Sequence, residues 1–483
     1  MKQSFLNALK NGDISNHVLS MNNRGLRKIV LCILLGIIPF MTSVADNGEW
    51  YTQGNFMPTC RIEYIMENTL NIDRENCPVI ITRDDFPLPD LHEMWVTVVD
   101  PFLESSPEPS KELLESQGGH QLRKESNGHA IFHQLDDIDK DGIWDELFFQ
   151  VNLKAKEKRT IYIYIGENMR GWNPHRTHAN IGSYCRHLMP FWESENIGWK
   201  IWFANSVDVY AKRKPMLMSN RLYMGNRDGY GIADENYDYG SDIQSVDFTF
   251  GGGAICLFEH KDQPDKISDP RSTPTRAKLA PESRWNAGQI SDTRYAYDVI
   301  ANGPIRSIIR IKGMNWDTGN GFYEYEQYYT AYADQSYCTS KVIYTKFFPK
   351  LQGVLMGCGV RKKPRENSFF QKGGLLIQSG PENVKDPENI DDRAAWNVPF
   401  IGTALVVKDK YNPQYQYIKD NEGNHAFRVV PDENKSYEYM LIAGWSDGAV
   451  YNTKESFDSY AQKCALEYNN PVNASLVKTE QKQ

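Results

Sequence analysis

A dense group of carboxylates lies between residues 137 and 146, with aspartates at every second position, then a glycine, then an acidic pair. Its members are Asp137, Asp139, Asp141, Asp145 and Glu146. Two carboxylates about 5 Å apart repel each other by roughly 3 kcal/mol at an effective dielectric constant near 20. The loop is therefore stable only if water screens these charges or a cation neutralises them. We predict calcium, a hard cation that takes roughly six to eight oxygen ligands.

The spacing matches the first half of an EF-hand, with ligands at the first, third and fifth positions and glycine at the sixth. The twelfth position holds Phe148, where an EF-hand needs a bidentate glutamate. The residues that follow have a period of two, so we predict a calcium loop ahead of a β-strand, with a structural role for the metal. The alternative is a solvated acidic turn between two strands.

A second group of candidates lies on two predicted strands, 305–312 and 322–332. In the first strand, Arg306, Arg310 and Lys312 share one face while isoleucines fill the other. In the second, glutamates share one face, and Tyr329 lies on the other. If the strands are neighbours, the basic and acidic rows meet across the sheet. That face is either a solvated, salt-bridged surface or a floor where arginine binds a uronic carboxylate and aromatic rings stack on sugars.

Histidines are scarce, and His175 and His178 form a His-x-x-His pair. No cysteine or acidic residue beside the pair completes a zinc signature, so zinc is not expected. Both histidines are candidate general bases near neutral pH. His260, at the end of the predicted strand 254–259, is a further candidate. The alternative for each is a surface histidine without a chemical role.

Motifs and charge exclude several classes of protein. The sequence has no Gly-x-Ser-x-Gly elbow, P-loop or dinucleotide-binding fingerprint, which removes support for a serine hydrolase, an NTPase or a Rossmann dehydrogenase. The formal net charge is −8, and it becomes −12 without residues 1–45, which hold five basic residues and one acidic residue. We therefore expect no general affinity for nucleic acid. Disulfides are permitted but not required, and Cys60 and Cys77 are the nearest cysteine pair.

The first 45 residues resemble an export signal. An apolar run over residues 29–41 follows Arg24, Arg27 and Lys28 and precedes small residues typical of a cleavage site. We predict a signal peptide over residues 1–45, translation from Met21, and a periplasmic or secreted protein. The run is too short for a transmembrane helix, and we expect no membrane span in the mature chain. The oligomeric state cannot be read from the sequence.

The rest of the chain predicts a mostly β protein. Short alternating segments separated by turn residues over residues 46–170 predict a small β-sandwich that carries the acidic loop. The same pattern over residues 171–470 predicts a large antiparallel β-sandwich, with one helix at 456–468. Residues 471–483 are predicted to form a tail.

Several segments, in this order, resemble the bacterial domain-of-unknown-function family 4861, whose members are exported proteins of polysaccharide-utilisation systems. They are residues 76–81, 136–150, 207–213, 240–242, 251–253, 303–306 and 443–445. The resemblance implies a supersandwich like that of galactose mutarotases and several polysaccharide lyases. At least one relative looks like a dehydratase acting on a terminal uronic acid. The family has a Tyr-His motif ahead of its Gly-x-Asp, whereas residues 230–242 contain no histidine.

Two functions follow. The first is a lyase or dehydratase for oligosaccharides that contain uronic acid, which needs a group to neutralise the carboxylate, a base and an acid. We assign Arg213 or Arg310 as the neutralising group, His175 or His178 as the base and Tyr329 as the acid, with Arg306 and His260 as further contacts. The second is a non-catalytic glycan-binding protein on the same scaffold, which the missing histidine motif favours.

Overall fold

The computed structural model describes most of the chain beyond residue 49. The described residues are 50–51, 56–91, 95–103, 110–116, 130–167, 174–184, 187–202, 205–218, 240–244, 246, 249–270, 293–384, 396–419 and 423–482. The predicted export signal and the start site Met21 lie outside them. So do Asn173 and most of the segment 230–242, where the family's histidine motif is missing. Residues 50–483 form one compact unit.

Two antiparallel sheets form a small β-sandwich. The first has the order β24-β1-β6-β3, with β24 (Asn473–Gln481), β1 (Met57–Glu67), β6 (Lys158–Glu167) and β3 (Val96–Val99). The second has the order β2-β5-β4, with β2 (Arg74–Thr82), β5 (Glu146–Leu153) and β4 (His133–Asp136). Alternate residues of these strands, such as Ile62 and Ile163, are fully buried in one hydrophobic core.

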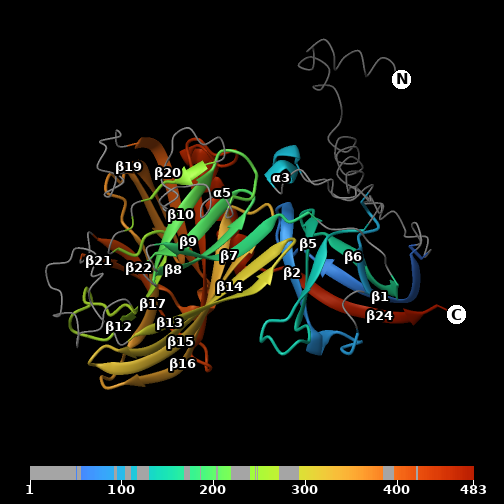
Figure 1. The fold of residues 1–483 in the computed structure, drawn as a ribbon, viewed down its shortest axis with the longest axis horizontal. Coiled ribbons are helices and arrows are strands. Elements are labelled where there is room, and N and C mark those ends of the chain that lie inside the picture. Colours follow the sequence, from blue (N-terminus) through green and yellow to red (C-terminus); the bar gives the residue numbers. More distant parts are fainter. Residues whose placement is uncertain are drawn as a thin grey trace, which may run out of the picture. The chain divides into compact units, whose positions relative to one another are not determined.

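The C-terminal residues correct our sequence interpretation. Residues 473–481, which we predicted to be part of a tail, form β24, and this strand pairs with β1 along its length. Figure 1 shows β24, in red, beside β1, in blue. The register places Glu480 opposite Arg61, and the two side chains form an ion pair at 2.6 Å. The sequence showed little alternation of apolar and polar residues here, because β24 is an edge strand whose residues are mostly exposed.

Three further antiparallel sheets form the large β-sandwich (Figure 1). The five-stranded sheet comprises β11 (Gly240–Asp242), β10 (Ser206–Lys212), β9 (Ile197–Trp202), β8 (His187–Ser194) and β7 (Thr177–Tyr184). The four-stranded sheet comprises β12 (Ala254–Phe258), β17 (Leu355–Arg361), β22 (Asn424–Val429) and β21 (Gln414–Ile418). The eight-stranded sheet comprises β13 (Arg294–Asn302), β14 (Arg306–Asp317), β15 (Gly321–Tyr332), β16 (Tyr337–Pro349), β23 (Ser436–Trp445), β20 (Trp396–Val407), β19 (Leu375–Val384) and β18 (Ser368–Lys372).

One large hydrophobic core joins these three sheets. Trp199 and Val209 enter it from the five-stranded sheet, Cys358 from the four-stranded sheet, and Trp316 and Tyr439 from the eight-stranded sheet. The predicted mostly β fold, with a small sandwich followed by a large antiparallel sandwich, is confirmed. Large aromatic side chains, among them Trp192 and Trp445, fill much of this core.

Helices are short and few among the described residues. They are η1 (Arg83–Asp85), α3 (Lys111–Ser116), η3 (Asp409–Tyr411) and α5 (Lys454–Asn469). The predicted helix at 456–468 corresponds to α5, which begins after Thr453 with a capping box that involves Ser456. Its Phe457 packs on the eight-stranded sheet. No helix in these parts of the chain has the length and apolar character needed to cross a membrane.

The described cysteines are buried free thiols, and Cys60 and Cys77 are among them. These two were the nearest pair in sequence, but the structure does not join them. The small sandwich therefore depends on its hydrophobic core and on contacts with the large sandwich.

Arg306 makes a buried, charged contact between the two sandwiches. Its Nε atom donates to Asp136 Oδ2 at 2.7 Å, and its Nη1 atom donates to Glu146 Oε2 at 2.7 Å. Burial alone would lower the pKa of Arg306, but the two carboxylates raise it above its ordinary value. The guanidinium also lies over the ring of Phe148. One side chain of β14 thus holds the last residue of β4 and the first residue of β5.

We expect Arg306→Met to destabilise the protein by about 3–5 kcal/mol, because it leaves buried carboxylates without a cation. Arg310→Met is the matched control, since Arg310 lies on the same strand and pairs with the half-exposed Asp298. That exposed pair contributes about 1 kcal/mol or less. Urea unfolding of both variants checks this, and equal losses would contradict the assigned role of Arg306.

Candidate functional site

A row of polar side chains crosses one face of the five-stranded sheet. The register pairs His178 with Glu193, Glu193 with Gly198, Gly198 with Tyr210, and Tyr210 with Asp242. The residues between them, such as Ala179, Trp192 and Ala211, point into the core of the sandwich. Because side chains alternate along a strand, these five positions share the opposite face. We call them the polar row.

Gly198 at the centre of the polar row makes room for its neighbours. A Cβ atom at this position would lie 2.7 Å from Phe191 Cζ and 3.4 Å from Tyr210 Cβ. The two rings instead meet edge to face, with their centroids 5.4 Å apart. Met218 completes a small apolar cluster with them. The polar row is thus divided into a His178 end and an Asp242 end.

The His178 end holds a histidine beside a buried ion pair. His178 Nδ1 lies 3.9 Å from Glu193 Oε1. Burial lowers the pKa of His178 below its ordinary value, and the charge of Glu193 offsets this only in part. The imidazole is therefore neutral near pH 7, and its contact with Glu193 is not an ion pair. A neutral imidazole beside a carboxylate can accept a proton.

Glu193 is held in place by Lys212. The Lys212 ammonium donates to Glu193 Oε2 and to the Ser194 carbonyl, and it reaches the Met216 carbonyl at 2.8 Å. The backbone N–H of Met218 also donates to Glu193, at 3.0 Å. Lys212 has used its three donors and is fully buried. Its role is to fix Glu193, which in turn faces His178.

The Asp242 end holds two carboxylates around one ammonium group. Lys200 Nζ lies 3.4 Å from Asp208 Oδ2 and 3.4 Å from Asp242 Oδ2, and it donates to the Tyr210 hydroxyl at 2.7 Å. Burial and the charge of Asp242 raise the pKa of Asp208 well above its ordinary value. Burial also raises the pKa of Asp242, although Lys200 opposes this. We call Lys200, Asp208, Tyr210 and Asp242 the lysine cluster.

His175 lies next to the start of β7. A Cβ atom on Gly303 would lie 2.9 Å from His175 Cε1, so the turn at Gly303, whose φ is 139°, leaves space for the imidazole. Burial lowers the pKa of His175, and the nearby His178 lowers it further. The structure therefore brings the two predicted bases together, both in their neutral form near pH 7.

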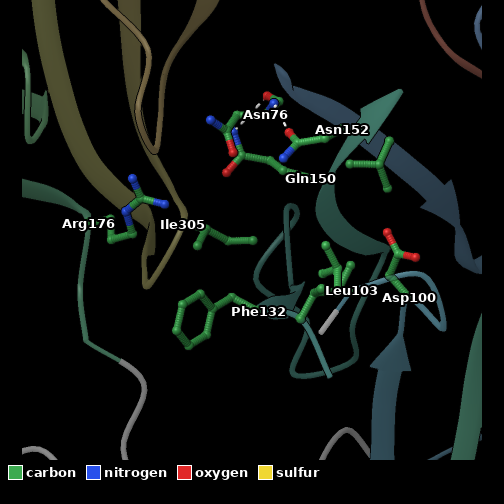
Figure 2. Close-up of a pocket in the computed structure, with 10 residues that line it drawn as sticks. Asn76, Asp100, Leu103, Phe132, Gln150, Asn152, Arg176 and Ile305 are labelled. Atoms are coloured by element: carbon green, nitrogen blue, oxygen red, sulfur yellow. Dashed lines mark hydrogen bonds between the residues drawn. The ribbon is translucent and has the colours of Figure 1, made fainter. Parts of the chain in front are cut away.

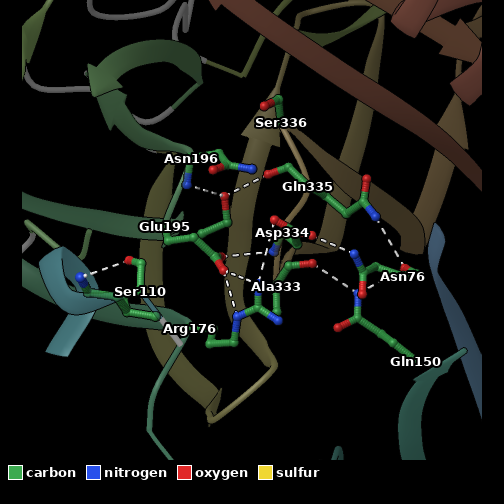
Figure 3. A network of polar contacts seen from close by, with 12 residues as sticks. Asn76, Ser110, Gln150, Arg176, Glu195, Asn196, Ala333, Asp334, Gln335 and Ser336 are labelled. Carbon is green, nitrogen blue, oxygen red and sulfur yellow. Dashed lines mark hydrogen bonds and ion pairs between the residues drawn. The ribbon is translucent and has the colours of Figure 1, made fainter. Parts of the chain in front are cut away.

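Beside His175, a polar network joins the two sandwiches (Figure 3). Arg176 Nη2 lies 2.6 Å from Glu195 Oε1 and 3.5 Å from Asp334 Oδ1. The Asn76 side chain donates to Asp334, and Gln150 donates to the carbonyls of Asn76 and Ala333, at 2.9 Å each. Since all these partners are mutually engaged, the network fixes the loop that precedes β7.

A small cavity opens beside this network (Figure 2). Its volume is about 50 Å³, and its lining is half polar and half apolar. The lining includes Asn76, Gln150, Asn152, Arg176 and Ile305. A buried water needs about 10–15 Å³, so the cavity has room for a few waters and is too small for a sugar ring.

The predicted arginines do not share a hollow. Arg213 follows Lys212, lies over the ring of Trp445 and pairs with Asp447 at 3.6 Å. Arg310 pairs with Asp298 at 2.8 Å. Arg306 is occupied by Asp136 and Glu146, so it is not available to a sugar carboxylate. Of the three, only Arg213 adjoins in sequence a residue that contacts the polar row, namely Lys212, which binds Glu193.

The basic strand does meet the acidic strand, as the sequence led us to expect. β14 pairs with β15, Lys312 is opposite Glu326, and their charged atoms are 3.4 Å apart. The paired ions make this a salt-bridged sheet surface, which was the alternative to a glycan-binding floor.

Two other predicted residues lie elsewhere. Tyr329 is fully buried in the core, stacked on Trp192 with centroids 4.4 Å apart, and its hydroxyl lies 3.2 Å from that of Tyr439. Burial raises its pKa well above the ordinary value. A side chain in this position cannot reach a glycan, so the role of acid does not fit Tyr329. His260 follows β12, and its Nε2 lies 3.2 Å from Asn320 Nδ2, away from the polar row.

The acidic loop brings three of its five predicted ligands together. Oxygens of Asp137, Asp139 and Asp145 lie within 4.8 Å of one another. Glu146 is turned instead toward Arg306, and Asp141 accepts the backbone N–H of Ile143 at 2.8 Å. Backbone N–H groups donate to the three grouped carboxylates, for example from Lys140 to Asp137 at 2.7 Å. The donor set, all carboxylate oxygen, fits a hard cation such as calcium.

Glu193, Lys200, Asp208 and Asp242 are the site residues that our sequence reasoning missed. A signal was present, because Asp208, Tyr210 and Lys212 alternate with the apolar residues of a strand that is otherwise suited to burial. Asp208, Lys212 and Asp242 also lie within the segments that carry the family resemblance. Alternation of polar and apolar residues is equally typical of a solvated sheet face. Only the burial of these polar side chains distinguishes a site from such a face.

Comparisons with known proteins agree with the family resemblance. Two solved structures resemble the chain, an alpha-mannosidase from Enterococcus faecalis V583 and a protein in the Glycosyl Hydrolase Family 38 from Enterococcus faecalis. Sequence identity is 10% and 11%, the TM-score is 0.42 for each, and the matches cover 88% and 86% of this chain. They cover 46% and 47% of those proteins, so the chain spans about half their length. A search of curated protein sequences found no match. The model of the family described as Domain of unknown function (DUF4861) matches residues 109–474, and the chain therefore belongs to this family.

Proposed function

We propose that the protein is an exported, carbohydrate-active lyase or dehydratase that acts on oligosaccharides containing uronic acid. The observation that carries this proposal is the neutral His178 held beside Glu193. Arg213 directly follows Lys212, the last residue of β10, whose ammonium group binds Glu193. A base and a cation that can neutralise a carboxylate are the two groups that elimination from a uronate requires. The periplasm or the exterior of the cell is where we place the activity, because of the predicted export signal.

Elimination proceeds through removal of the proton on C5 of the uronate. Arg213 exchanges its half-exposed partner Asp447 for the sugar carboxylate, which makes the C5 proton more acidic. His178 takes that proton, and Glu193 stabilises the imidazolium that forms. The electron pair of the broken C5–H bond forms the double bond between C4 and C5 as the bond from C4 to oxygen breaks. The departing oxygen takes up the proton that His178 removed from C5, which returns the imidazole to its neutral form.

We expect His178→Asn to lower turnover of uronic-acid oligosaccharides by at least about 100-fold, because general base catalysis contributes roughly that much or more. The measurement is the ultraviolet absorbance of the new double bond across a panel of substrates, with calcium present. His133→Asn, in β4, is the control and should keep full activity. If the folded wild-type protein gives no product with any uronate, the lyase is excluded.

The second candidate is a non-catalytic glycan-binding protein that uses the same end of the sheet. The missing Tyr-His motif in residues 230–242 favours it. Calorimetry with the same oligosaccharides separates the two functions. Binding that is lost in Arg213→Met, without any product from the wild type, supports the binding protein.

The lowered pKa of His178 predicts how stability depends on pH. A histidine whose folded pKa lies below that of the unfolded chain stabilises the fold above the ordinary pKa of about 6.5, and this stabilisation is lost as pH falls. We expect the melting temperature of the wild type to fall between pH 7 and pH 5.5, and to fall less in His178→Asn. An equal slope in both proteins would mean that His178 is not the titrating group.

We also propose that the acidic loop binds calcium through Asp137, Asp139 and Asp145. The ion would neutralise three carboxylates that lie within 4.8 Å of one another. Both ends of the loop are held by Arg306, and the Lys140 ammonium donates to the Ile300 carbonyl of β13 at 2.6 Å. Calcium would therefore stiffen the loop against the large sandwich rather than take part in catalysis.

A free calcium concentration about a hundred times the Kd should stabilise the folded protein by about 2.7 kcal/mol. Thermal unfolding with calcium and with a chelator measures this increment. It should disappear in Asp137→Asn and in Asp139→Asn and persist in Asp84→Asn, a change at an exposed acid in η1. The same melting temperature with and without calcium would show that the loop is a solvated turn.

A further inference from the structure

The lysine cluster contains more negative groups than positive ones, and it is buried. Asp208 is 4% exposed, Asp242 is 5% exposed and Lys200 is 2% exposed. Two ionised carboxylates beside one ammonium group would leave a net charge of −1 in the interior. An uncompensated buried charge is so unfavourable that the group normally changes its protonation state instead.

Among the residues that the structure describes, none supplies a second cation to the two carboxylates. Lys200, on β9, is the only positive side chain within ion-pair distance of either carboxylate in the described part of the chain. The other donors to the two aspartates are backbone groups, from Val209 to Asp208 at 3.0 Å and from Gln244 to Asp242 at 3.2 Å. Further along the face, the ammonium of Lys212 is already bound to Glu193.

The two carboxyl groups share one cationic partner. Each places an Oδ2 atom 3.4 Å from the same Lys200 Nζ atom. Asp208 lies on β10 and Asp242 on the neighbouring strand β11. The geometry therefore offers one ammonium group to two buried carboxyl groups on adjacent strands. A carboxyl and carboxylate pair of this kind titrates as a unit.

We propose that Asp208 and Asp242 hold one proton between them at neutral pH, so that the lysine cluster has no net charge and the polar row can accept an anionic sugar beside His178. The first half of this inference concerns the protein alone. The second half rests on the proposed function, because a dianionic cluster behind the row would repel a uronate. The two aspartates are positioning residues, since they are buried and do not contact the substrate.

Infrared difference spectroscopy at pH 7 tests the proton directly. The wild type minus Asp242→Asn should show the carbonyl stretch of one protonated carboxyl group, and so should the wild type minus Asp208→Asn. In each variant, the remaining aspartate is ionised and paired with Lys200. Asp298→Asn, at a half-exposed ion pair, should show no such band. Absence of the band from both of these difference spectra would overturn the inference.

Stability gives a second test that needs no substrate. An amide has nearly the same shape as the protonated carboxyl group, so Asp242→Asn should keep the melting temperature near that of the wild type at pH 7, whereas Lys200→Met should lower it. Groups whose folded pKa is raised stabilise the fold at low pH, and this is lost as pH rises through the folded pKa. The wild type should therefore lose stability as pH rises from about 4, where aspartates of the unfolded chain ionise, through the folded pKa, and Asp242→Asn should lose less. A large loss in Asp242→Asn at pH 7 would contradict the proposal.

Binding of a uronic-acid oligosaccharide tests the link to the proposed function. Its Kd should increase at alkaline pH in the wild type as the pair becomes dianionic, and it should be less dependent on pH in Asp242→Asn. If the infrared band is present but no uronate binds, the shared proton is supported and the anionic substrate is excluded. If uronate binds but the infrared band is absent, the anionic substrate is supported and the shared proton is excluded.

Discussion

Buried charge has to be balanced, and this constraint organises the whole structure. Arg306 is buried because Asp136 and Glu146 balance it, and this pairing joins the end of β4 and the start of β5 to β14. Glu193 is buried because Lys212 balances it. Breaking such a pair is costly, because the partner that remains is a charge without water or a counterion. The charged residues therefore fix positions rather than add much net stability.

The same constraint shapes the chemistry of the polar row. Lys212 holds Glu193, and Glu193 faces an imidazole that burial keeps neutral, so the accessible group of the site is ready to accept a proton. At the other end of the row, one ammonium serves two carboxylates. Gly198, with Phe191 and Tyr210 packed over it, separates the two ends. The histidine and the two buried aspartates thus lie toward opposite ends of one row of a single sheet.

Patterns that involve neighbours in sequence were predicted well. Alternation gave the strands of both sandwiches, and the start of α5 follows from Thr453 and its capping box. The pairing of Lys312 with Glu326 followed once their strands were adjacent. Predictions failed where the outcome depended on distant partners. Tyr329 was predicted to act as an acid, but Trp192 and Tyr439 enclose it. Glu146 reads as a calcium ligand, but Arg306, far along the chain, takes it.

The sequence by itself determined the mostly β architecture, the closeness of His175 to His178, and the acidic loop, because each depends on spacings of a few residues. Tertiary structure alone decided which face of each strand is buried, and therefore which charges are paired. Arg306, Arg310 and Arg213 are alike as residues, yet one is a buried clamp, one a surface ion pair and one a candidate ligand for a carboxylate. The physical reason is that the free energy of a charge depends on the water and counterions around it, and these are set by contacts between strands that are distant in the chain.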